Sequence, residues 1–164
     1  MVGEYNHEFF MNEALKEAEK SLIDGGYGIG AILVSDDRII SKAKGSATCI
    51  RKDPTAHAET QLVDLIKGTE FYTSEKIREM TVYSTLEPCI MCYSTLLILK
   101  MGKIVYGAKD DKGGFIPRPE IIPPIFRKNM PEIIGGIMEE DCLEVFLRNR
   151  EEMDKKYLND SLFK

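Results

Sequence analysis

The sequence predicts an α/β protein in which a mixed sheet lies between layers of helices. Three observations predict this fold class. The chain has 164 residues, the usual size of one domain. Its apolar residues recur at helical spacing in some stretches and in short strand-like runs in others. After an initial hairpin, strands alternate with helices, an order typical of a sheet covered by helices. We therefore expect residues 1–164 to form a single domain.

The first part of the chain predicts one amphipathic helix and a hairpin. Asn6 is a suitable N-cap for the helix, and Gly25-Gly26 ends it. A short polar turn, Ser35-Asp36-Asp37, joins the two apolar runs that follow, as in a hairpin. The predicted elements are a helix over 6–23, strands over 29–34 and 38–43, and a polar loop over 46–53.

The second part predicts strands and helices in alternation. Asp53 fits a cap position and Pro54 the first turn of a helix, where the missing N–H needs no partner. A helical connection between the last two strands would make that pair parallel. The predicted elements are a helix from Asp53-Pro54, a strand over 81–84, a helix from Pro88 to about residue 100, a strand over 103–108, a Gly- and Pro-rich stretch over 113–131 with room for a short helix at 121–128, a strand over 133–138 and a helix over 139–157.

The composition is that of a globular cytoplasmic protein. No run of about 18 apolar residues predicts a membrane span, and the N-terminus is too charged for a signal peptide. Four cysteines are too few for a disulfide scaffold, so we expect a reducing compartment and ordinary thiols at Cys49 and Cys142. The net charge of −5 gives no overall attraction for nucleic acid.

Two short motifs carry chemistry: His57-Ala58-Glu59 and Pro88-Cys89-Ile90-Met91-Cys92. His57, Cys89 and Cys92 are good zinc ligands, and the two cysteines lie three residues apart, on one face of a helix. Three protein ligands leave a fourth zinc position for water, which is typical of a catalytic site. We therefore predict one Zn²⁺ ion per chain.

Glu59 is a carboxylate that this ligand set does not need. Two thiolates and a neutral imidazole cancel the charge of the zinc ion, so its bound water needs help to lose a proton. Glu59 can act as the general base, and then as the general acid toward a ring nitrogen and departing ammonia. The sequence therefore predicts hydrolysis, with Glu59 as the catalytic residue.

Each motif alone has another interpretation. The C-x-x-C follows a predicted strand, so it could be a redox pair or half of a structural zinc site. Cys49, Cys142 and His7 have no spacing that would complete a four-ligand site. The combination of H-x-E with P-C-x-x-C is the established signature of zinc deaminases, and it is far more specific than either part.

At these motifs the chain resembles the cytidine deaminase-like superfamily, in the branch of tRNA adenosine, guanine and cytosine deaminases. The match is almost letter for letter over 53–59 and 85–92, extends to 7–11, 30–34, 136–138 and Cys142, and is weakest over 113–131. The resemblance implies a three-layer α/β/α fold whose five-stranded mixed sheet has strands four and five parallel. It also implies His57, Cys89 and Cys92 as ligands, Glu59 as proton shuttle, and often a homodimer.

Two departures from the pattern of this branch concern the substrate. Gly45-Ser46 stands where the family usually has an Asn that bonds the base or sugar, and Ser46 could make only one such bond. Tyr27-Gly28 stands where a Pro commonly precedes the first strand, and Tyr27 could cap the pocket or lie in the core. The residues that we expect to contact substrate are Tyr27, Ile29, Ser46, Ala58 and Phe115.

Three classes of function remain open. The altered loop and the negative net charge favour a free amino-nucleobase or nucleoside of the guanine, cytosine or adenine type. The signatures and basic residues such as Arg148 and Arg150 favour adenosine in a tRNA, although acidic residues interleave with these cations. A zinc-stabilised scaffold without activity is the third class, against which Glu59 argues. We expect the first class, with a small molecule as the partner.

Overall fold

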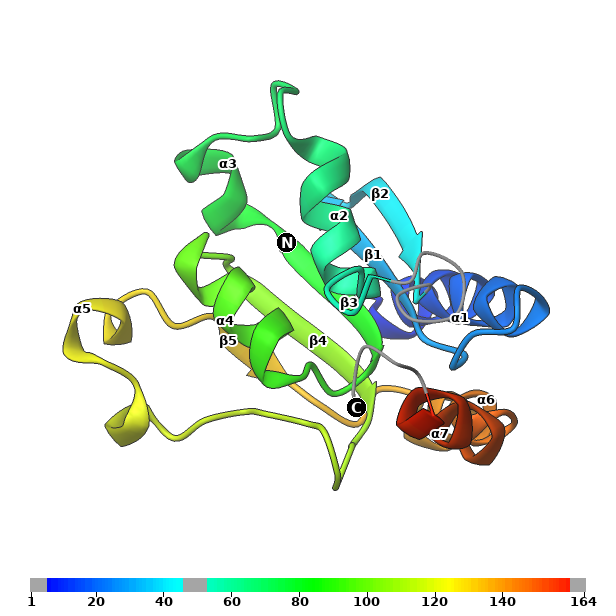
Figure 1. Cartoon of the computed structure of the whole chain (residues 1–164). Coiled ribbons are helices and arrows are strands. Elements are labelled where there is room, and N and C mark those ends of the chain that lie inside the picture. The colour runs from blue at the N-terminus through cyan, green and yellow to red at the C-terminus, as the bar shows by residue number, and fades with distance from the viewer. Residues whose placement is uncertain (1–5, 46–52, 160–164) are drawn as a thin grey trace.

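The computed structural model describes residues 6–45 and 53–159, and its helices lie on both faces of one sheet (Figure 1). The sheet has five strands in the order β2-β1-β3-β4-β5. β1 pairs antiparallel with β2 and β3, whereas β3–β4 and β4–β5 are parallel. This confirms the mixed sheet and its parallel last pair. The strands are β1 (Gly30–Ser35), β2 (Arg38–Lys44), β3 (Thr81–Leu86), β4 (Lys103–Ala108) and β5 (Glu132–Ile134).

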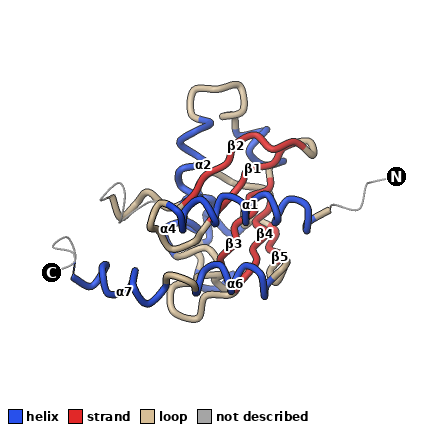
Figure 2. The backbone as a smooth tube through the Cα atoms, turned by 90° about the vertical axis from the view of Figure 1, so that its right-hand side faces the viewer, coloured by secondary structure: helices blue, strands red, loops and turns tan. Residues whose placement is uncertain are grey.

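The helices form the outer two layers. α1 and α6 cover one face of the sheet, and α2 and α4 lie on the other (Figure 2). No helix among the described residues is long and apolar enough to cross a membrane. The helices are α1 (His7–Ile23), α2 (Ala58–Ile66), α3 (Ser74–Glu79), α4 (Ile90–Ile98), α5 (Pro124–Arg127), α6 (Glu139–Leu147) and α7 (Arg150–Asn159), with a 3-10 turn η1 (Pro119–Ile121).

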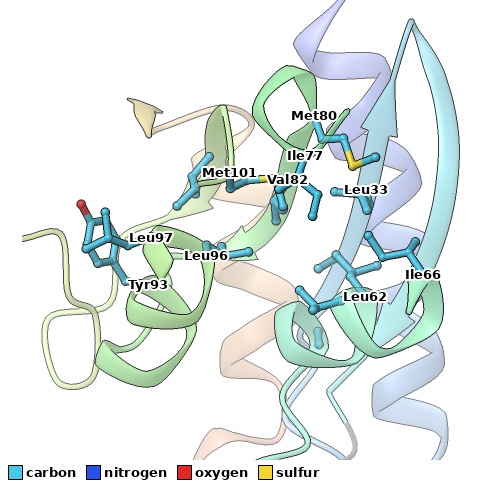
Figure 3. Packing of buried hydrophobic residues seen from close by; sticks show 14 of the residues in the cluster. Leu33, Leu62, Ile66, Ile77, Met80, Val82, Tyr93, Leu96, Leu97 and Met101 are labelled. Carbon is cyan, nitrogen blue, oxygen red and sulfur yellow. The ribbon is translucent and has the colours of Figure 1, made fainter. Parts of the chain in front are cut away.

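The core on the α2–α4 face holds the two motif-bearing helices against the sheet. Apolar side chains from both helices meet those of β1 and β3 there (Figure 3). Burial of each such side chain contributes about 1.5–3 kcal/mol to folding. These residues, all buried, include Leu33, Leu62, Ile66, Val82, Leu96 and Met101.

The core on the α1–α6 face is packed very closely. Phe10 and Ala14 of α1 are buried together with Cys142 and Phe146 of α6. β1 crosses α1 at such short range that a Cβ at Gly30 would lie 2.2 Å from the carbonyl oxygen of Ala14. Only glycine permits this approach.

The structure corrects the predicted starts of the two helices that follow the motif prolines. α2 begins at Ala58 rather than at Asp53-Pro54, because the Asp53 carboxylate accepts hydrogen bonds from the backbone N–H (2.9 Å) and hydroxyl (2.7 Å) of Thr55. Such bonds favour a turn over a helix. α4 begins at Ile90, two residues after the predicted start, and Cys89 is its N-cap.

The C-terminal half differs from the prediction in three further ways. α3 was not predicted. The predicted helix over 139–157 is two helices, interrupted at Arg148 and Asn149, and asparagine is a poor helix former. β5 ends at Ile134 rather than at residue 138, because Gly136 turns the chain with φ +84°. The short helix expected at 121–128 is α5, preceded by η1.

Candidate active site

Three donor atoms from α2 and α4 meet at the N-terminal ends of these helices. His57 is the N-cap of α2, Cys89 is the N-cap of α4, and Cys92 lies in the first turn of α4. His57 Nδ1 lies 3.5 Å from Cys89 Sγ and 3.5 Å from Cys92 Sγ, and all three atoms lie within 4.8 Å of one another.

This donor set fits a zinc ion. In a tetrahedral zinc site, bond lengths of about 2.3 Å to sulfur and about 2.0–2.1 Å to nitrogen separate the two donors by about 3.6 Å. The two nitrogen–sulfur distances of 3.5 Å agree with that separation. Thiolate and imidazole are also the donor types that zinc prefers. Within the described residues, these three form the one group of His, Cys, Asp and Glu side chains that could hold a metal.

The proximity of the donors shifts their pKa values. The pKa of Cys89 falls to about 4, chiefly because its thiolate accepts a hydrogen bond from Cys92, and His57 adds to the effect. The pKa of Cys92 is raised, because it keeps the proton shared with Cys89 and is buried. The pKa of His57 is raised by its bond with Cys89. One thiolate is therefore formed at neutral pH, and a second beside it would require a cation between them.

Glu59 lies beside the donor atoms in the first turn of α2, and it is only 4% exposed. Its Oε1 accepts a hydrogen bond of 3.0 Å from Ser84 Oγ on β3, and its Oε2 lies 3.3 Å from Cys92 Sγ. Both carboxylate oxygens therefore have fixed positions. A buried carboxylate held next to a metal site in this way can accept and return a proton.

A cavity of about 300 Å³ adjoins the donor atoms. This volume lies at the lower end of the range for small-molecule sites, about 300–1,000 Å³. His57, Glu59 and Cys89 are among its lining residues. Four residues that are far from the motifs in sequence also line it, and we call them the far wall: Tyr27, Phe146, Arg150 and Asp154.

The structure brings some of the predicted substrate contacts together and not others. Tyr27, Ile29 and Ala58 line the cavity. Phe115 is not among its lining residues: its backbone N–H bonds the carbonyl of Pro88 (2.8 Å), and its ring lies edge-on against Tyr93. Ser46 and Cys49 lie outside the described residues, as does the C-terminal tail over 160–164. Gly45, next to Ser46, lines the cavity.

Several cavity residues were not predicted from the sequence. Glu87 precedes the second motif directly, and that adjacency was a signal that could have identified it. Asp110 and Lys112 follow β4, and Arg150 and Asp154 belong to α7. From the sequence, Arg150 was noted only as a basic residue interleaved with acidic ones. No spacing rule connects α7 with the motifs, because only the folded chain places them together.

Comparisons with known proteins agree with this site. Residues 4–108 match the family model described as the cytidine and deoxycytidylate deaminase zinc-binding region. The tRNA-specific adenosine deaminase of Haemophilus influenzae is 33% identical over 152 residues, which cover 90% of this chain and 87% of that protein.

Two solved structures are similar in both sequence and fold. A tRNA:A34 deaminase is 31% identical with a TM-score of 0.68, and the match covers 84% of this chain and 98% of that one. The guanine deaminase of Bacillus subtilis is 28% identical with a TM-score of 0.54, and the match covers 63% of this chain and 65% of that one.

Proposed function

The chain belongs to the cytidine and deoxycytidylate deaminase zinc-binding family, and we propose that it deaminates a free purine base or purine nucleoside. Family membership makes it a zinc-dependent hydrolytic deaminase. In the reaction, water supplies an oxygen to the ring carbon that carries the amino group. The carbon–nitrogen bond breaks, and ammonia leaves. The substrate class and the roles of the residues are the proposal.

We assign His57, Cys89 and Cys92 as the zinc ligands and Glu59 as the catalytic residue. Zinc, when bound, makes a water molecule nucleophilic at neutral pH. Glu59 accepts the proton of the attacking water at its carboxylate. It delivers that proton to the ring nitrogen, then takes the remaining proton of the added oxygen and passes it to the departing amine. The hydrogen bond from Ser84 (3.0 Å) keeps the carboxylate oriented through both transfers.

The observation that carries the small-molecule assignment is the pairing of the cations that line the cavity. Arg150 Nη1 lies 3.6 Å from Asp110 and its Nε lies 3.3 Å from Asp154, and Lys112 Nζ lies 4.0 Å from Asp154. Binding of RNA depends largely on cations that contact phosphates. At the cavity these cations already have carboxylate partners, which suits a neutral base better than a polynucleotide. A purine is favoured because the similar proteins described above act on adenosine or guanine, as their names state.

Adenosine in a tRNA is the second candidate, and the sequence relatives favour it. An adenosine inside a folded RNA would have to leave its stack to reach the cavity. The ion pairs of Arg150 and Lys112 would then have to open for the neighbouring phosphates.

A substrate panel tests the proposal. Ammonia release by the zinc-loaded chain is measured with guanine, adenine, cytosine, their nucleosides and an anticodon stem-loop that carries adenosine. We expect turnover of a purine base or nucleoside and none of the stem-loop. Turnover of the stem-loop alone would replace the proposal by the second candidate, and turnover of cytosine or cytidine alone would refute the purine assignment.

A further inference from the structure

We infer that Tyr27 and Asp154 are positioning residues that hold α7 as the far wall of the cavity and so determine which substrates fit. This inference rests on the proposed function only in that the substrate occupies this cavity. Neither residue belongs to the two helices that carry the donor atoms, so we expect their effect to be on substrate fit rather than on the chemical step.

The contact between these residues links distant parts of the chain. Tyr27 Oη donates a hydrogen bond of 3.2 Å to Asp154 Oδ1, across 127 positions of sequence. The other carboxylate oxygen of Asp154 accepts from Arg150 Nε at 3.3 Å and lies 4.0 Å from Lys112 Nζ. One carboxylate therefore connects the segment before β1, the segment after β4 and α7.

Arg150 adds a second connection between α7 and the rest of the cavity. Its guanidinium lies 4.5 Å from the ring centroid of Phe146 on α6 and 3.6 Å from the carboxylate of Asp110. The side chains of Arg150 and Asp110 are only 17% and 12% exposed. Partly buried pairs of this kind are screened less by solvent than exposed surface pairs.

Of the α7 side chains that the structure describes, only Met153 is buried. Met153 is 1% exposed and lies between Arg150 and Asp154 in sequence, so one face of the helix is docked. Glu151, Glu152 and Lys155 are exposed. Buried Met153 and the polar contacts of Arg150 and Asp154 at the cavity therefore contribute to the docking of α7.

A special backbone conformation positions Tyr27. Gly28 has φ +73°, a region that side-chain-bearing residues rarely adopt. A Cβ at Gly28 would also lie 2.7 Å from the carbonyl oxygen of Val145 on α6. This turn brings the ring of Tyr27 alongside that of Phe146, with centroids 6.4 Å apart. The backbone conformation at Gly28 therefore sets the position from which Tyr27 bonds Asp154.

The consequence for catalysis follows from where the residues lie. Glu59 and the three donor atoms lie at the starts of α2 and α4, whereas Arg150 and Asp154 belong to α7. Release of α7 would remove part of the surface against which the substrate packs and leave the proton-transfer geometry intact. KM should therefore rise while kcat stays nearly constant.

The test compares Tyr27→Phe and Asp154→Asn with Glu152→Gln. The control residue is exposed on the same helix and pairs only outward, with Lys156 at 2.8 Å. KM and kcat are measured for the best substrate of the panel, and amide hydrogen exchange is measured across α7. We expect KM to rise about tenfold in both variants, with kcat within about twofold, and exchange in α7 to become faster. Glu152→Gln should behave as the unaltered chain.

Either of two results in Tyr27→Phe and Asp154→Asn would overturn the inference. In the first, amide exchange in α7 and KM both stay unchanged. In the second, kcat falls while KM stays constant. If the unaltered chain turns over no purine but does act on the stem-loop, the proposed function fails, and the same KM comparison is made with the stem-loop. If no substrate is turned over, exchange decides alone: faster exchange of α7 in Tyr27→Phe but not in Glu152→Gln supports the inference, and equal exchange refutes it.

Discussion

His57 and Cys89 occupy the same structural position, the N-cap of a helix, and this position explains how two distant motifs form one site. The positive ends of α2 and α4 both point toward the donor atoms, where unpaired backbone N–H groups stabilise negative charge. Residue types and spacing were enough to predict this part of the site. Asp110, Arg150 and Asp154 were not predictable as cavity residues, because charged residues on a helix or loop are usually solvated and only tertiary packing brings these three together.

Replacement of Glu59 by Gln should abolish turnover without loss of zinc. The amide keeps the shape of the side chain but cannot accept the proton, so kcat should fall by about 10²–10⁴-fold. Glu75→Gln is the matched control, since Glu75 also lies in the first turn of a helix but is exposed on α3. Zinc content is measured in parallel. Turnover above one-tenth of the unaltered level would contradict the role given to Glu59.

Replacement of Cys89 by Ala should remove both zinc and the stability that zinc confers. Two remaining donors bind the metal weakly, and metal binding stabilises only the folded state. Zinc per chain should fall to less than about one-tenth, and the thermal midpoint should fall by several degrees. Cys142→Ala is the control, because Cys142 is buried among α6 and the sheet rather than near the donors. Equal zinc content in the two variants would show that the ligand assignment is wrong.

At the scale of helices and strands, hydrophobic spacing predicted most elements and missed those set by local turns or distant contacts. The helix over 6–23 and the hairpin strands appear within one or two residues of their predicted bounds. The predicted starts of α2 and α4 were wrong because hydrophobic spacing does not reveal the side-chain hydrogen bonds of Asp53 or the N-cap position of Cys89. α3 was missed because it is a six-residue helix, too short to show a helical period.

The close crossing of α1 over β1 predicts that Gly30 tolerates no side chain. In Gly30→Ala the new Cβ would meet backbone atoms of α1, the carbonyl oxygen of Ala14 at 2.2 Å and the N atom of Ala18 at 2.3 Å. Backbone cannot shift cheaply, so the free energy of unfolding should fall by about 3 kcal/mol or more. Gly25→Ala is the control: nothing lies within 4 Å of its Cβ, although its φ of +77° makes alanine strained. Denaturant unfolding that gives both variants equal stability would contradict this packing.

The contact between α1 and β2 predicts a stability term that depends on pH. Glu13 pairs with Lys16 and Lys42, and the bonds from these two lysines lower the pKa of its carboxyl to about 2 from an ordinary value of 4.5. A lowered carboxyl pKa stabilises the fold above pH 4.5, and that contribution is lost as the pH falls from 4.5 toward 2.

Glu13→Gln should therefore destabilise the fold by about 1 kcal/mol at pH 7 and progressively less below pH 4.5. Unfolding curves at a series of pH values measure this difference. Glu8→Gln, on an exposed part of the same helix, serves as the control. A loss for Glu13→Gln that is the same at pH 3 as at pH 7 would refute the coupling.

At the scale of the whole molecule, the three-layer fold and the zinc chemistry could be predicted from the sequence, whereas the substrate could not. The motifs determine where the metal donors lie. The shape of the cavity depends instead on α7, which is far from the motifs in sequence, and on Gly45. The homodimer and the cytoplasmic location stay predictions. Whether the substrate is a small purine or a tRNA therefore depends on the residues of the far wall.

The most direct test of the zinc-dependent hydrolytic reaction is ammonia release measured against zinc occupancy, in water enriched in oxygen-18. The zinc-free chain is titrated with zinc in the presence of the best substrate of the panel. Ammonia release should rise in proportion to occupancy, level off at one zinc per chain, and yield a product that carries one labelled oxygen for each ammonia released. Full turnover by the zinc-free chain, or a product without the label, would contradict it.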